Sequence, residues 1–493
     1  MKIFNFRNNS NLLNNSNVYV YYVVFSIICI VFGFLVGYSA YIAIAVIGAC
    51  GILLFISKEP LIVLILLILL SPYAGTIYLR ENMFDIPGSK PILVLGFLTA
   101  LVSLINFQAA SKMPKYAYYF SVAIITIFTI SIFRSLTHLD VFNKNFVEMG
   151  QNTFTTFGYI LSAYVKELIF FLPFIIIIKY AKTERHLNII MDIIFITILL
   201  FSIHLLYERS QFIKNGMNST DGTGITEYYS DIYGLHRNSL ALFYVCGLPY
   251  AFRRFFLGKK MINILFILII LTGISFLFSR TGYGAAIFAL IYYLIISKRK
   301  KYLPIVIIIA SICLIYLAST AIIQRATTGF NEKDTYKISA GRIDQIWIPL
   351  IEENLNHNKK FLFGDGRYAI LASDSLNEGK IAFVGHPHNM YLETLLDAGV
   401  ISLIIIITFF YVITRKAYIT LKNTDDIQMK ENLYACIVSI LSFLLSGMTG
   451  RSFFPMNENI LIWVVLGCTI ASCQLINNKR KELQRAPATQ FQG

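Results

Sequence analysis

Long apolar runs follow one another along the whole chain and are separated by shorter polar segments. A run of about 20 apolar residues is the length that an α-helix needs to cross the hydrocarbon core of a bilayer. Lipid offers no hydrogen-bond partners, so such runs are expected to be helical. We therefore predict an all-α polytopic membrane protein with fourteen spanning helices. The predicted spans are 18–37, 39–57, 60–73, 91–107, 116–133, 164–181, 187–206, 238–252, 261–279, 282–297, 303–323, 389–414, 432–449 and 459–476.

Basic residues indicate which ends of these helices face the cytoplasm. With the N-terminus inside, 24 of the 42 basic residues but only 7 of the 27 acidic residues fall on the inner segments. Lys and Arg gather in short cytoplasmic loops, so both termini are expected to be cytoplasmic. The chain then divides into a cytoplasmic N-terminus (1–17), helices 1–11 (18–323), a large periplasmic loop (324–388), helices 12–14 (389–476) and a basic cytoplasmic tail (477–493).

Composition narrows the function classes. The net charge of +15 is explained by the inner loops, so nucleic acid is not an expected partner. The sequence has no GxxxxGK[ST] motif, which excludes a P-loop ATPase, and no Cys or His spacing typical of a metal site. No metal or other cofactor is therefore expected. Asp192 and Glu167 are the main charges inside the predicted spans, whereas an ion-coupled transporter normally needs more.

Three outer segments are long, at 134–163, 207–237 and 324–388. Long connections in compact proteins are usually functional or disordered. In the largest segment, the stretch Gly341–Leu355 carries apolar residues at helical spacing, which predicts an amphipathic helix bent at Pro349.

The first candidate for chemistry is His388, in the sequence GHPHN (385–389) that ends the largest outer segment. A histidine titrates near neutral pH and can move a proton. Alternatively, His388 or Asn389 caps the following helix, whose start Pro387 would fix. His386 lies only two residues away, so the histidine that acts is not certain from spacing alone.

The second set of candidates is made of arginines in outer segments: Arg237, Arg280, Arg342 and Arg367. A guanidinium binds phosphate through paired hydrogen bonds and stays charged at any working pH. Each of them could instead reach lipid headgroups or pair with an acid. Arg280 is expected to be functional, because it is wedged between two apolar helices that a very short connection joins.

Glu393 and Asp397 follow Asn389 at intervals of four residues, so the three share one helix face. They would orient His388 or bind a sugar hydroxyl, or else bond to a neighbouring helix.

The sequence resembles the O-antigen ligase/polymerase superfamily of bacterial envelope glycosyltransferases. The resemblance covers about residues 235–405. It rests on the residues Arg237-Asn238, Ser279-Arg280-Thr281, Gly341-Arg342-Ile343, Gly364-Asp365-Gly366, His388-Asn389-Met390-Tyr391-Leu392 and Gly399.

The resemblance implies transfer of a glycan from undecaprenyl diphosphate to an acceptor hydroxyl, with inversion and without a metal. It implies an enzyme of the bacterial inner membrane whose site faces the periplasm. His388 would be the general base, and Arg237, Arg280 and Arg342 would hold the diphosphate. Arg280 is grouped with His388 as catalytic, while Arg367, Asn389 and Glu393 join the predicted substrate-binding set.

Two activities occur in this superfamily. A polymerase extends the chain on a lipid-linked repeat unit, and a ligase moves the finished chain to lipid A-core or, in some members, to protein. The expected helix number and the second long outer segment favour the polymerase, with a chain-length regulator as an additional partner. A flippase for the same lipid-linked sugars is the alternative of a different class.

Overall fold

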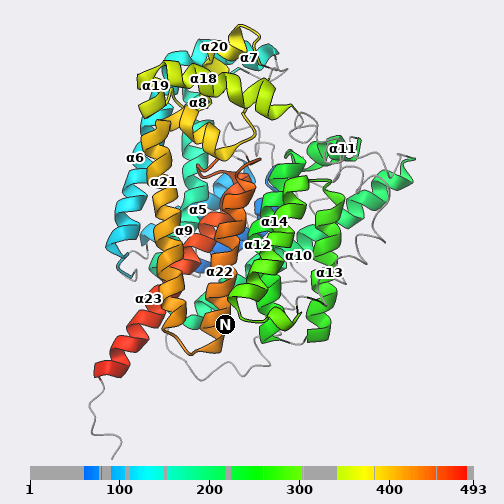
Figure 1. The fold of residues 1–493 in the computed structure, drawn as a ribbon, viewed down its shortest axis with the longest axis vertical. Coiled ribbons are helices and arrows are strands. Elements are labelled where there is room, and N and C mark those ends of the chain that lie inside the picture. Colours follow the sequence, from blue (N-terminus) through cyan, green and yellow to red (C-terminus); the bar gives the residue numbers. More distant parts are fainter. Residues whose placement is uncertain are drawn as a thin grey trace, which may run out of the picture.

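The computed structural model describes residues 60–76, 79, 90–105, 111–148, 153–216, 224–258, 260–302, 304, 341–381, 384–450 and 452–485. Two of the expected spans, 18–37 and 39–57, lie outside the described residues, as does 303–323 except for Pro304. The described part contains helices and no strand, which confirms the all-α prediction (Figure 1).

Each of the other eleven expected spans coincides with a helix. Seven helical stretches of the described part are long and apolar enough to cross a membrane, and four apolar helices are shorter. The total of fourteen spans and their orientation in the membrane stay predictions. The helices are α3 (Pro60–Leu70), α5 (Pro91–Ile105), α6 (Lys115–Ser135), α9 (Lys166–Tyr180), α10 (Glu184–Lys214), α12 (Arg237–Leu257), α13 (Lys260–Phe276), α14 (Arg280–Ile296), α21 (Met390–Lys422), α22 (Ile427–Ser446) and α23 (Ile460–Arg485).

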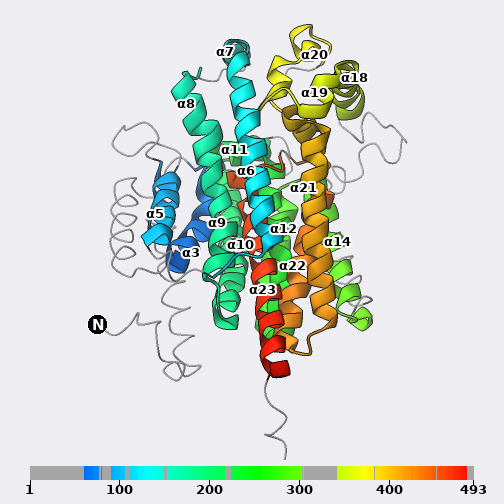
Figure 2. The ribbon, with the colours of Figure 1, turned by 90° about the vertical axis from the view of Figure 1, so that its left-hand side faces the viewer.

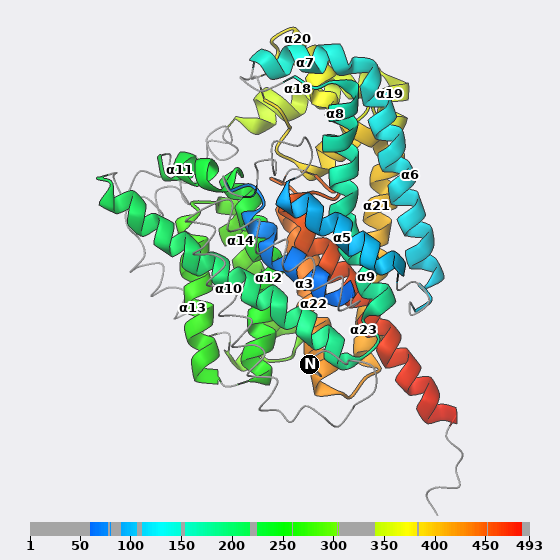
Figure 3. The same ribbon diagram turned by 180° about the vertical axis from the view of Figure 1, so that it is seen from behind.

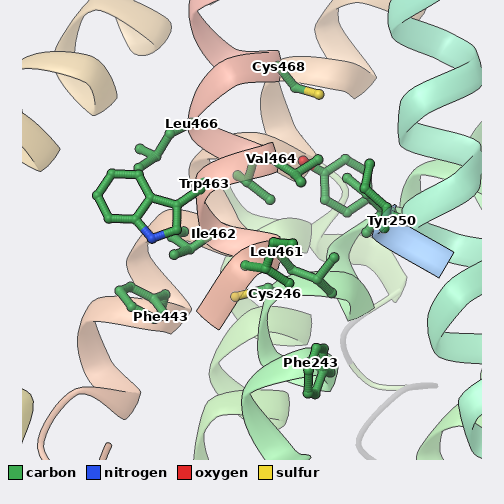
Figure 4. Packing of buried hydrophobic residues seen from close by; sticks show 14 of the residues in the cluster. Phe243, Cys246, Tyr250, Phe443, Leu461, Ile462, Trp463, Val464, Leu466 and Cys468 are labelled. Carbon is green, nitrogen blue, oxygen red and sulfur yellow. The ribbon is translucent and has the colours of Figure 1, made fainter. Parts of the chain in front are cut away.

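The bundle is built around α12, α22 and α23. Helix α12 packs against α22 and α14, and α23 packs against α9 (Figures 1 and 3). Trp463 of α23 is fully buried and meets the ring of Phe171 edge-on at 5.0 Å between centroids. Figure 4 shows this side chain among the packed apolar residues of α12, α22 and α23. Close packing of apolar side chains, rather than burial from water, holds spanning helices together.

The outer segments form a second, smaller layer at one end of the bundle (Figure 2). This layer contains α7 (Leu139–Glu148), α18 (Ile348–Asn356), α19 (Asn358–Phe363) and α20 (Asp374–Asn377). It has its own buried core, to which Phe142, Ile346, Leu350, Ile370 and Phe454 contribute. The described part of the large loop is therefore a folded layer that can hold side chains in fixed places.

The predicted amphipathic helix at Gly341–Leu355 is confirmed, with one irregularity. It begins with a π-helical turn, η7 (Ile343–Trp347), and continues as α18 with Pro349 in its first turn. Ile346 and Leu350 turn into the core of the outer layer, whereas Leu355 is 55% exposed. The change of helix type thus lies just before the expected bend.

Helix α21 joins the outer layer to the bundle. It is broken at Gly399, where φ is +79°. The carbonyls of Leu396 and Asp397, which this break releases from the helix ladder, accept hydrogen bonds from the backbone N–H groups of Asp365 and Gly366 at 2.8 and 3.1 Å. The outer layer is therefore hydrogen-bonded directly to the break in this helix.

Ion pairs gather at the opposite end of the bundle. Arg253 and Arg254 of α12 both pair with Asp192 of α10, at 2.7 and 2.8 Å. Arg299, which follows α14, pairs with Glu431 of α22. The segments that were expected to lie together on the cytoplasmic side therefore do meet at one end of the molecule.

Candidate active site

His388 occupies the junction between the outer layer and α21. Its backbone is left-handed, with φ at +54°, which is uncommon for a residue with a Cβ. Its N–H donates to Nδ1 of His386 at 3.3 Å, and the two imidazole rings lie 4.0 Å apart between centroids. Unusual backbone held by its surroundings is a feature of functional sites.

Asn389 caps α21. Its side-chain oxygen accepts hydrogen bonds from the N–H groups of Tyr391 and Leu392, at 3.0 and 3.1 Å. Of the two residues that could cap this helix, Asn389 is therefore the one that does so. Its hydrogen bonds hold the helix start in place beside His388. Its direct contact with substrate stays a prediction.

A third histidine, His236, faces His388 from another part of the chain. The two ring centroids are 6.1 Å apart. His236 caps α12 by accepting from the N–H of Asn238, so the next residue, Arg237, begins that helix. The guanidinium of Arg237 donates to Thr226 Oγ1 at 3.1 Å. The start of α12 therefore lies beside the His388 segment.

The start of α14 is tied to the same place. Ser279 caps this helix and donates its hydroxyl hydrogen to the side-chain oxygen of Asn238 at 2.9 Å. Arg280 is the first residue of α14, so it is held one residue from this contact. The next residue, Thr281, shares a hydrogen bond with Thr449.

Residues 447–449 close the link between Arg280 and His388. Gly447 accepts a hydrogen bond from the backbone N–H of Met390 at 2.8 Å, two residues after His388. Thr449, two residues further along, is the partner of Thr281. Contacts from both sides thus connect the segments that carry Arg237, Arg280 and His388.

Arg342 enters from the outer layer. It directly precedes η7, and Trp347 at the end of this turn donates its indole N–H to the carbonyl of Pro387 at 2.8 Å. The helix that begins with Arg342 is therefore hydrogen-bonded to the residue that precedes His388. Four predicted site segments, far apart in the sequence, are in this way joined by direct contacts.

Arg367 and Glu393 lie in a buried ion network. The guanidinium of Arg367 is fully buried, and its nitrogen atoms lie 2.7 Å from Glu393, 2.6 Å from Asp397 and 3.4 Å from Glu167. Burial alone would lower the pKa of Arg367, but the surrounding carboxylates raise it well above its usual value. These contacts favour a positioning role for the pair, and direct contact with substrate stays a prediction.

Sequence reasoning did not include His236, Trp347 or Thr449 among the site residues. The signal for His236 is its place directly before Arg237-Asn238, and the signal for Trp347 is its place in the predicted outer helix. Nothing in the local sequence marks Thr449. Across the part of the chain that the structure describes, no three His, Cys, Asp or Glu residues are arranged to hold a metal ion.

Comparison with known families gives a match over part of the chain. Residues 264–407 match the family model described as O-antigen ligase (Wzy_C). The matched region includes Arg280, Arg342 and His388, whereas Arg237 lies before it. No curated protein matches the sequence. Residues 264–407 of this multi-pass membrane protein are therefore similar to the O-antigen ligase family, which confirms the resemblance to the O-antigen ligase/polymerase superfamily.

Proposed function

We propose that this protein is an O-antigen polymerase, which transfers a glycan from undecaprenyl diphosphate to a lipid-linked repeat unit at the periplasmic face of the bacterial inner membrane. The observation that carries the proposal is the set of contacts between the His388 segment and the starts of α12, α14 and η7. These contacts join the segments that begin with Arg237, Arg280 and Arg342 to the segment that carries His388.

In this reaction an acceptor hydroxyl oxygen attacks the anomeric carbon of the donor sugar. The bond from that carbon to the phosphate oxygen breaks, and the electron pair leaves with the lipid diphosphate. Attack from the face opposite the leaving group inverts the anomeric centre. The hydroxyl proton passes to His388, whose base catalysis contributes about 10²–10⁴-fold.

Arg237, Arg280 and Arg342 stabilise the leaving group. The diphosphate gains negative charge as its bond to the sugar breaks, and preorganised guanidinium groups interact most strongly with that developing charge. No P-loop or similar nucleotide-binding motif is needed, because the donor carries its own activated bond. Arg280 belongs to the catalytic pair with His388, since it begins a helix at the junction.

The buried ion network around Arg367 positions His388. Arg367 connects the outer layer to Glu393 and Asp397, which lie one and two turns after Asn389 on α21. In this account the network fixes the direction in which the start of α21 presents His388.

The polymerase is preferred to the ligase because a second long outer segment, 207–237, is predicted; its described residues include the end of α10 and α11 (Gly224–Tyr233). The ligase, which transfers the glycan to lipid A-core or to protein, uses the same site residues and is the second candidate. A flippase is the third. It receives less support, because the histidine and arginine candidates meet at one end of the bundle.

The test is a gel of surface glycolipids from a deletion strain that expresses wild type, His388→Ala or Arg280→Ala. Exposed His357→Ala and Arg480→Ala are the matched controls. A polymerase defect leaves one repeat on the core without a ladder. Polymer that builds up on the carrier, with none attached to the core, would identify a ligase instead. Repeats that accumulate on the cytoplasmic side would identify a flippase.

A further inference from the structure

The π-helical turn η7 brings Arg342 and Trp347 to the same face of the outer helix, toward the His388 segment. In a helix closed by bonds between residues i and i+5, residues five apart lie nearly above one another, whereas in an α-helix they lie on different faces. Arg342 and Trp347 are five residues apart across η7. Trp347 contacts Pro387, so the face that carries both residues is directed at the His388 segment.

Trp347 donates a hydrogen bond to the peptide group between Pro387 and His388. The carbonyl of Pro387 and the N–H of His388 belong to the same planar peptide. Trp347 Nε1 donates to this carbonyl at 2.8 Å, and the N–H of the same peptide donates to His386 Nδ1 at 3.3 Å. Both polar atoms of the peptide are therefore fixed by side chains.

The orientation of this peptide determines the φ angle of His388. That angle is +54°, and the left-handed conformation is unfavourable for a residue with a Cβ. Without a restraint the backbone would relax and turn the imidazole in a new direction. The two hydrogen bonds to the Pro387–His388 peptide therefore help to fix the direction of the His388 side chain.

We infer that Trp347 is a positioning residue for His388, and that it couples the direction of the imidazole to the outer helix that carries Arg342. The inference rests on the proposed function, because it assumes that His388 acts as the base. Trp347 contributes through the Pro387–His388 peptide and needs no contact with substrate.

The experiment is Trp347→Phe, which keeps an aromatic ring and removes the N–H donor. Trp463→Phe is the matched control, because the indole nitrogen of Trp463 is buried and has no hydrogen-bond partner among the described residues. Both purified variants are assayed with lipid-linked repeat units. We expect kcat to fall about three- to tenfold for Trp347→Phe, as for one lost hydrogen bond, with KM unchanged. Trp463→Phe should keep the wild-type kcat.

A double variant separates positioning from a general loss of structure. In the His388→Ala background, Trp347→Phe should cause no further loss, because it acts through the side chain that is already absent. The same fold-loss in both backgrounds would overturn the inference, and so would a raised KM with unchanged kcat. Full activity of His388→Ala would instead refute the proposed function.

If Trp347→Phe does not fold, His386→Phe removes the other restraint of the same peptide while keeping a ring. It should lower kcat at unchanged KM and should also be silent in the His388→Ala background. An effect of equal size in that background would likewise reject the positioning role.

Discussion

Arg367 shows how much a single buried side chain can determine. Three carboxyl groups, from Glu167, Glu393 and Asp397, surround its guanidinium. Ions in the interior are tolerated only with good partners, because desolvation costs several kcal/mol for each of them. Removing the one cation would leave three acids facing one another in a site closed to water.

We expect Arg367→Met to lower the free energy of unfolding by about 3–5 kcal/mol, the usual cost of breaking a buried ion pair from one side. Thermal unfolding of the purified protein in detergent measures this loss. The control is Arg134→Met, since Arg134 is partly exposed and donates to the carbonyls of Phe363 and Gly364. It should cost about 1 kcal/mol. If Arg367→Met lowers the free energy of unfolding no more than Arg134→Met does, the ion network does not stabilise the fold.

A rescue adds a second check on the same network. Combining Arg367→Met with Glu393→Gln and Asp397→Asn removes two of the three uncompensated charges, so part of the lost stability should return. No recovery would show that the guanidinium matters through its packing alone.

Sequence could nominate the arginines and His388, because each stands beside a helix start that is marked by Ser, His, Asn or Gly. It could not supply their partners. Arg367 meets Glu167 across 200 positions, and His236 meets His388 across 152. Contacts of this kind follow from the packing of helices, on which a single sequence carries little information.

At the scale of the elements, hydrophobic run length predicted each of the seven helices in the described residues that are long and apolar enough to cross a membrane. It did not predict where helices change character. The break at Gly399 and the π-turns at Leu161–Val165 and Ile343–Trp347 lie inside continuous apolar or amphipathic patterns. A pattern of side chains records which face is apolar, whereas a local change in hydrogen bonding leaves that pattern nearly unaltered.

Gly399→Ala should test the break in α21. A Cβ at this residue would lie 2.3 Å from the carbonyl oxygen of Leu362, and φ there is +79°. We expect a loss of about 2–3 kcal/mol in unfolding free energy, together with loss of activity as α19 is displaced.

Gly284→Ala in α14 is the matched control for this substitution. An added Cβ there meets no described atom outside its own helix within 4 Å. Because alanine is the better helix former, this variant should be neutral or more stable by about 0.5–1 kcal/mol. Equal behaviour of the two variants would mean that the break is dispensable.

At the scale of the whole molecule, the proposed site and the ion pairs of Asp192 and Glu431 lie at opposite ends of the helix bundle. Arg280 begins α14 at the junction with the outer layer, and Arg299 follows the other end of the same helix. A helix of this length spans about 25 Å at 1.5 Å per residue. The ion pairs around Glu431 and Asp192 are therefore remote from the proposed reaction.

This separation predicts opposite phenotypes at the two ends. Glu431→Gln breaks the pair with Arg299, whose side chain is 25% exposed and can partly rehydrate, so we expect a loss of about 2 kcal/mol in stability. Activity per folded molecule should stay at the wild-type level. His388→Ala should do the reverse and lose activity with stability unchanged. A Glu431→Gln protein that is fully folded and inactive would contradict this division.

The two tryptophans of the chain divide between the same regions, since Trp463 lies in the bundle core and Trp347 beside the catalytic junction. The Trp463→Phe variant would therefore contain a single tryptophan, which can be excited selectively over the tyrosines. Its emission would come from the indole whose N–H is bonded to the Pro387 carbonyl. That tryptophan is therefore an intrinsic optical probe of the proposed active site, and a change in its emission on addition of lipid-linked repeat units would report binding without any attached dye.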